Sequence, residues 1–127
     1  VIGSEVEYAM DQALNQHGGL VREFTVAPNV NPLEGGLPYH EWLVEFDEAP
    51  NDIEAFMTSL DAGLRQKNSY YEDLITGAIL RPCVLRSLGP ESFIRYMKSE
   101  GKLGGQNKVP RLTNDRKIAE ALLALEA

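Results

Sequence analysis

A strand, a helix and a second strand follow one another between residues 40 and 86, and this succession constrains the fold more than any other feature. Residues 40–47 alternate between two sets of side chains, which predicts a strand with an aromatic inner face (His40, Trp42, Val44, Phe46) and a mostly acidic outer face (Glu41, Leu43, Glu45, Asp47). Apolar side chains at helical spacing predict a helix over 53–64, and residues 79–86 predict another strand. Because a helix joins the two strands, they can lie parallel through a right-handed crossover.

The remaining segments complete an α+β architecture. The pattern Ser4-x-x-Glu7 resembles a capping box and begins a helix that ends at Gly18-Gly19. A strand follows and ends at Pro28, residues 28–38 form a long loop, and Tyr70 to Ile75 add a short helical turn. Pro90 starts another helix that ends at Gly101, and Thr113 or Asn114 caps the last one. The predicted order is α-β-β-α-β-α-loop-α, with a small three-stranded mixed sheet packed with helices.

Length and composition indicate one soluble domain over residues 1–127. A chain of this size buries about two thirds of its unfolded surface, which is enough for a core without disulfides. No run of about 18 apolar residues exists to span a bilayer. Cys83 is the single cysteine, which is typical of a small buried thiol in a reducing cytoplasm. The chain begins at Val1 rather than methionine, so we expect it to be a piece of something longer.

The charge is unevenly distributed. The formal net charge of −7 argues against nucleic acid as the main partner. Between Arg95 and Lys117, however, seven basic residues accompany only two acidic ones. This basic segment suits a small polyanion or an acidic partner surface, although a solvated face is the commoner explanation of such a run.

The loop from Gly104 to Arg111 lies inside that basic segment and is the best candidate for chemistry. Gly104 and Gly105 permit backbone motion on one side of Lys108, and proline stiffens the other side, so the lysine can be swung toward an anion. The alternative is an ordinary exposed lysine on a glycine-rich loop. The neighbouring Arg111 and the surrounding basic segment support the functional interpretation.

Other constellations carry no chemistry. His17 and His40 with one distant cysteine provide no zinc spacing, and we expect both to be structural. Glu45, Asp47 and Glu48 lack the pattern of a calcium loop and are interpreted as a solvated strand end, so no metal is assigned. The sequence contains no nucleophile elbow and no phosphate loop. Three tyrosines could line a surface: Tyr39, Tyr70 and Tyr71.

Several segments resemble the auxin-responsive Gretchen Hagen family of acyl acid amido synthetases, particularly its bacterial branch. The most specific is the Gln-x-Lys-x-Pro-Arg core formed by Gln106, Lys108 and Arg111, together with the following Asn114-Asp115-Arg116. Residues 37–42 and the Ser4-Glu5-Val6-Glu7 start are also similar. The likeness covers nearly the whole chain but only the small C-terminal domain of the family. Plant members usually have an aromatic residue where this chain has Asn107.

The resemblance implies an ATP-dependent, adenylate-forming ligase of the wider acyl-CoA synthetase and luciferase superfamily. A carboxylic acid would attack the α-phosphorus of ATP, and an amino acid amine would then attack the acyl adenylate. The family lysine corresponds to Lys108, which would contact the carboxylate and α-phosphate oxygens. Arg111 and Gln106 would support it, by phosphate contact or by binding the loop to the large domain, while Gly104 and Gly105 absorb backbone change.

The same resemblance implies that this chain is a mobile lid excised from a two-domain enzyme. Its partner would be its own N-terminal domain, which would bind ATP and Mg²⁺, and the isolated chain would be inactive and bind no cofactor. Nucleic acid and membranes are not expected partners. The competing hypothesis is a non-enzymatic α+β module that binds a small metabolite or a partner protein through the 28–38 loop and the basic segment, because a small sheet with helices serves many unrelated tasks.

Overall fold

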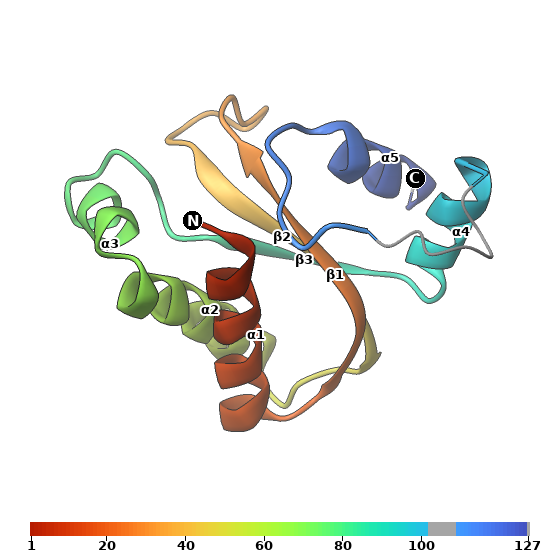
Figure 1. The fold of residues 1–127 in the computed structure, drawn as a ribbon, viewed down its shortest axis with the longest axis horizontal. Coiled ribbons are helices and arrows are strands. Elements are labelled where there is room, and N and C mark those ends of the chain that lie inside the picture. The colour runs from red at the N-terminus through yellow and green to blue at the C-terminus, as the bar shows by residue number, and fades with distance from the viewer. Residues whose placement is uncertain (102–108, 127) are drawn as a thin grey trace.

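A mixed three-stranded sheet lies between two groups of helices in the computed structural model, which describes residues 1–101 and 109–126 (Figure 1). The elements in chain order are α1 (Gly3–His17), β1 (Leu20–Asn29), β2 (Tyr39–Glu48), α2 (Ile53–Lys67), α3 (Ser69–Thr76), β3 (Val84–Leu88), α4 (Ser92–Ser99) and α5 (Lys117–Leu125). The predicted α+β class and element order are confirmed, with α3 as the short additional helix. Among the described residues, no helix is long and apolar enough to cross a membrane.

The sheet has the order β1-β2-β3, so β2 is its central strand. β1 runs antiparallel to β2, and β2 runs parallel to β3, as expected when a helical crossover joins two strands. The register of β1 shifts near Val21, where the two strands are irregularly paired. Leu20 at the start of β1 is exposed, whereas both faces are covered farther along the strand, where Phe24, Thr25 and Val26 are all buried.

Helices α1, α2 and α3 cover one face of the sheet. Phe24, Val26, Trp42 and Val44 project from β1 and β2 into a core shared with these helices. α1 and α2 cross closely at Gly63, where an added Cβ atom would lie 2.8 Å from the Cα of Ala9. Most of the aromatic face predicted for β2 therefore lies in the main core, as the alternation indicated.

Helices α4 and α5 cover the opposite face, and here one prediction is wrong. The outer face of β2 is not a solvated acidic surface, because Glu41, Leu43 and Glu45 are at most 2% exposed. Leu43 packs with Phe93 of α4 and Leu122 of α5 in a second core. Of the proposed solvated strand end, only Asp47 and Glu48 are exposed.

Several element ends also differ from the predictions. The capping box of α1 uses Ile2 as the N-cap with Glu5, because the backbone N–H of Ile2 donates to the Glu5 carboxylate at 2.8 Å. β1 continues through Pro28, which pairs with His40. Helix α4 begins only at Ser92, two residues after Pro90. The last helix begins after Arg116, where the carboxylate of Asp115, rather than Thr113 or Asn114, accepts from the N–H of Lys117 at 3.0 Å.

The predicted tyrosine surface is wrong for two of its three members. Tyr39 and Tyr71 are each 1% exposed, whereas Tyr70 is 70% exposed. The Tyr71 hydroxyl donates to the buried Asp61 carboxylate at 2.5 Å, and Asp61 also accepts from the backbone N–H of Cys83 at 3.1 Å. This contact joins α2, α3 and the approach to β3. Cys83 is buried, as expected, and burial raises the pKa of its thiol.

Candidate functional site

Most of the predicted site lies outside the described residues. Gly104, Gly105, Gln106 and Lys108 all fall within residues 102–108, for which the structure gives no description. Arg111 is the one predicted site residue that is described. The site is therefore built from the segment that follows Lys108 and from the elements that this segment contacts.

The segment 109–113, which leads to α5, lies along the edge of β1. Figure 1 shows the two side by side. The Val26 N–H donates to the Arg111 carbonyl at 2.8 Å, and the Thr113 N–H donates to the Val26 carbonyl at 2.9 Å. The Thr25 hydroxyl donates to the Pro110 carbonyl at 2.7 Å, and Val109 is buried against the second core. These contacts add a short parallel bridge, Val26 to Leu112, to the sheet.

The Arg111 side chain is held by groups of the same chain. Its guanidinium lies 4.4 Å from the centre of the Phe24 ring and donates to the Phe24 carbonyl at 3.0 Å. It forms ion pairs with Glu23 and, at 3.5 Å, with Glu7. Phe24 in turn stacks on Trp42 with ring centres 5.9 Å apart. Arg111 thus connects α1 to β1, a role that the sequence motif did not indicate.

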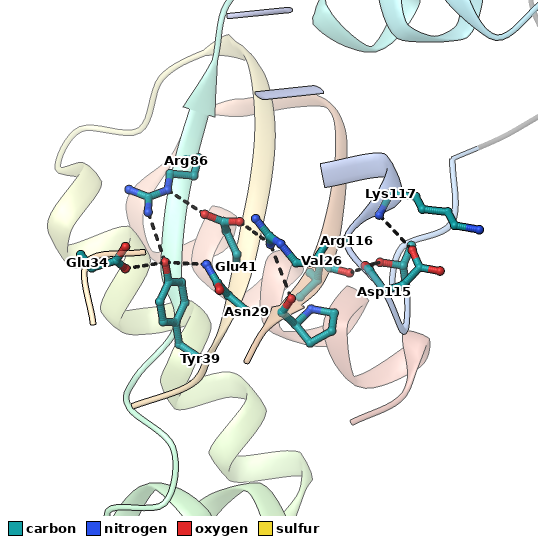
Figure 2. A network of polar contacts seen from close by, with 11 residues as sticks. Val26, Asn29, Glu34, Tyr39, Glu41, Arg86, Asp115, Arg116 and Lys117 are labelled. Carbon is teal, nitrogen blue, oxygen red and sulfur yellow. Dashed lines mark hydrogen bonds and ion pairs between the residues drawn. The ribbon is translucent and has the colours of Figure 1, made fainter. Parts of the chain in front are cut away.

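A polar network built on Glu41 lies on the opposite face of the sheet, which α4 and α5 cover (Figure 2). The Glu41 carboxylate is 1% exposed and accepts from Arg86 at 2.8 Å and from Arg116 at 2.6 Å. The Glu41 carboxylate raises the pKa of Arg86. The Tyr39 hydroxyl accepts from Asn29 at 3.0 Å and from Arg86 at 3.3 Å. A buried carboxylate is stable only when it is paired in this way.

A cavity of about 530 Å³ opens beside this network. Its lining combines the two guanidiniums with three carboxylates and an apolar rim; the residues that matter here are Arg86, Arg116, Glu34, Glu41, Glu120 and Leu33. The size is that of a pocket for a small molecule. Leu33 is fully exposed at its rim. Residues 29–34, from the segment predicted as the loop 28–38, thus form part of the pocket wall.

Two further carboxylates fix helix α4. Glu45, which is 2% exposed, accepts from the backbone N–H groups of Glu91 at 2.8 Å and Phe93 at 3.1 Å. Glu126 accepts from the Gly89 N–H at 2.8 Å and from the Ser92 hydroxyl at 2.9 Å. These contacts satisfy donors at the start of the helix from two distant parts of the chain. The apolar Leu43 between Glu41 and Glu45 was the sequence signal that this strand face is covered.

The histidines show no metal arrangement. His17 Nε2 lies 2.7 Å from the Ser59 hydroxyl, and His40 packs edge-on against the Tyr71 ring. Within residues 1–101 and 109–126, no group of three or more His, Cys, Asp or Glu side chains could hold a metal ion. Both histidines therefore have structural contacts.

His40 makes the stability of the fold depend on pH. Burial lowers the pKa of its imidazole below the ordinary value of 6.5, and its Nδ1 is buried without a hydrogen-bond partner among the described residues. Because the unfolded chain gains this proton first as the pH falls through 6.5, stability is lost below that pH. Urea unfolding at pH 7.5, 6.5 and 5.5 should show a smaller decrease in the free energy of unfolding toward low pH for His40→Gln than for wild type, because glutamine gains no proton. Parallel pH curves would contradict this.

With this geometry established, the chain can be compared with known proteins. The family model described as GH3 family C-terminal domain matches residues 4–117. The chain belongs to the GH3 family. The expected resemblance is thereby confirmed at the level of the family, and the matched region is its C-terminal domain.

Solved structures of GH3 proteins have the same fold. An AtGH3.15 acyl acid amido synthetase in complex with 2,4-DB superposes with a TM-score of 0.73 at 16% identity, over 94% of this chain and 23% of that one. A second GH3.15 acyl acid amido synthetase gives a TM-score of 0.71 at 18% identity, over 95% and 23%. Among curated proteins, none matches the sequence significantly. The GH3 chain described here thus spans about a quarter of the length of these solved relatives.

Proposed function

We propose that this chain is the C-terminal domain of an ATP-dependent acyl acid amido synthetase, which adenylates a carboxylic acid and joins it to the amine of an amino acid. The observation that carries the proposal is the GH3 C-terminal match over residues 4–117. The similarity to two acyl acid amido synthetase structures supports the same reaction class. The rest of the enzyme, corresponding to the larger part of those relatives, would bind ATP and the acyl acid.

In this proposal Lys108 is the catalytic residue. Negative charge develops at the α-phosphate while the carboxylate attacks it, and an ammonium group stabilises that charge once water is excluded. Gln106 would support the lysine, and Gly104 and Gly105 would absorb the backbone change as the domain moves over its partner. Mg²⁺ would be held with ATP by the larger domain, through one or two carboxylates and the substrate phosphates. Use of ATP and the unpaired Cys83 fit a reducing, cytoplasmic setting.

The proposal is tested with the full-length protein that contains this chain. Pyrophosphate release is measured across a panel of carboxylic acids, and amide and AMP are then quantified with each amino acid added. We expect pyrophosphate release that depends on the acid and AMP release that increases with the amine. The chain of residues 1–127 alone should show neither. A full-length protein that releases no pyrophosphate with any acid, or a fragment that is active alone, would sink the proposal.

The second candidate function is small-molecule binding without catalysis, and the cavity beside Glu41 favours it. Because guanidiniums and carboxylates both line the cavity, it is suited to ligands that carry charges of both signs. Amide NMR of residues 1–127 during titration with free amino acids and small carboxylates would test this function. Saturable shifts confined to residues 29–34 and 116–123 would support it, whereas no saturation below 10 mM, on the order of the weakest specific affinities, would exclude it.

A further inference from the structure

The chain that follows Lys108 is attached to β1 through its backbone. Three hydrogen bonds made by Thr25, Val26 and Thr113 hold the carbonyls of Pro110 and Arg111 and the end of this segment. Val109, which directly follows Lys108 in the chain, is 6% exposed and packs in the second core. The sheet and the second core therefore fix the position of this residue next to Lys108.

The Arg111 side chain strengthens this attachment. Its cationic plane lies against Phe24, its N–H groups donate to the Phe24 carbonyl, and two carboxylates from Glu7 and Glu23 balance its charge. A guanidinium is suited to such a site, since it stacks on an aromatic ring and donates in several directions within one plane. These contacts already neutralise the charge of Arg111 within the chain. Its guanidinium is therefore not placed like that of an arginine that binds phosphate.

We infer that Arg111 is a positioning residue: its clamp on Glu23 and Phe24 fixes the segment 109–111, which directly follows Lys108 in the chain. The inference rests on the proposed function, because it concerns the activity of that lysine. It goes beyond the sequence expectation for Arg111, which was contact with phosphate or with the large domain.

The energetic reason is the sensitivity of catalysis to placement. A catalytic group must be held within about 0.5 Å of its productive position by the residues behind it. A displacement of about 1 Å can cost on the order of 100-fold in rate, even when the altered residue is remote from the chemistry. Removal of one clamp contact is expected to loosen the attachment of this segment to β1 without abolishing it. A single substitution should therefore lower the rate by less, about tenfold.

The decisive experiment changes the partner of Arg111 and leaves the arginine intact. In the full-length protein, Glu23→Gln is compared with Arg111→Met and Arg111→Lys, and pyrophosphate release is measured against ATP concentration. If Arg111 positions Lys108, Glu23→Gln and Arg111→Met should each lower kcat about tenfold or more without changing KM for ATP. Arg111→Lys should recover little, since an ammonium cannot reproduce the stacked, multiply bonded guanidinium. Arg22→Gln is the control and should behave as wild type, because Arg22 lies beside Glu23 on β1 but forms only an exposed pair with Asp47 of β2.

Each outcome decides the inference. If Arg111→Met raises KM for ATP while Glu23→Gln behaves as wild type, Arg111 contacts phosphate and the inference is overturned. If neither variant changes kcat, the clamp has no role in the reaction. Should Arg111→Met fail to fold, Thr25→Val removes only the hydrogen bond to Pro110 and should lower kcat in the same way.

A second readout does not depend on activity. Hydrogen exchange of the Val26 and Thr113 amides, followed in residues 1–127, should become faster in Glu23→Gln and remain unchanged in Arg22→Gln. Unchanged protection in Glu23→Gln would show that Arg111 does not maintain the attachment. If the full-length wild type releases no pyrophosphate, the proposed function fails, and the exchange result still decides whether Arg111 holds this segment on β1.

Discussion

Lys108→Ala in the full-length protein should lower acid-dependent pyrophosphate release by about 10²- to 10³-fold. This is the usual cost of removing one preorganised donor from a transition state in which charge develops. The loss should appear in kcat, with little change in KM for ATP, because an interaction made only in the transition state does not stabilise bound substrate. Lys108→Arg should retain part of the rate, since it keeps the charge but not the compact ammonium geometry. The measurement is steady-state pyrophosphate release at saturating acid.

The matched control for this variant is Lys98→Ala. Lys98 belongs to the same basic segment and is exposed on α4, so its removal changes the net charge equally. It should leave the rate within about twofold, since a surface charge several residues away contributes mainly through screened electrostatics. Adenylation that is undiminished in Lys108→Ala would remove this lysine from the mechanism. Equal losses in both variants would show that overall charge, rather than one residue, is what matters.

Glu41→Leu should lower the free energy of unfolding by about 3 kcal/mol, the lower end of the cost of breaking a buried ion pair. The variant leaves Arg86 and Arg116 beside each other without their shared carboxylate. The lower end applies because Arg86 is 44% exposed and Arg116 25% exposed, so water can partly solvate the freed guanidiniums. Urea unfolding of residues 1–127 at pH 7 measures the change.

A double variant separates lost pairing from lost packing. Glu41→Leu combined with Arg116→Leu removes one of the two stranded cations and should be more stable than the single variant, because apolar groups replace a buried pair at little cost. Asp47→Ala, which breaks the exposed pair with Arg22, should cost less than about 1 kcal/mol. If Glu41→Leu costs no more than Asp47→Ala, the buried network does not stabilise the fold.

Much of the architecture follows from local pattern. The stripe that forms α2 and the alternation of β2 predicted both elements, and the helix between β2 and β3 predicted their parallel pairing. Element ends were less predictable, because several side chains can cap a helix and tertiary contacts select among them. The choice of Ile2 with Glu5 at α1, and of Asp115 at α5, illustrates this.

The candidate site, too, could be predicted only in part from the sequence. The motif around Lys108 pointed to the GH3 family, and the family is confirmed, while the roles of Lys108, Gln106, Gly104 and Gly105 stay predictions because these residues lie outside the described ones. Arg111 was found from its motif, but its partners were not. Glu23 and Phe24 lie nearly 90 residues earlier in the chain, and nothing in the motif itself identifies them.

The sequence by itself determined the helices and strands, the parallel crossover and the family, because periodicity and motifs are properties of neighbouring residues. Only the tertiary structure decided which charged residues are buried and which are exposed. The acidic face of β2 is consistent with either a solvated surface or a buried one, and the choice depends on whether distant helices return to cover it. Here α4 and α5 do so, and Glu41 and Glu45 are stable in the interior because Arg86, Arg116 and the N–H groups at the start of α4 reach them from elsewhere in the chain.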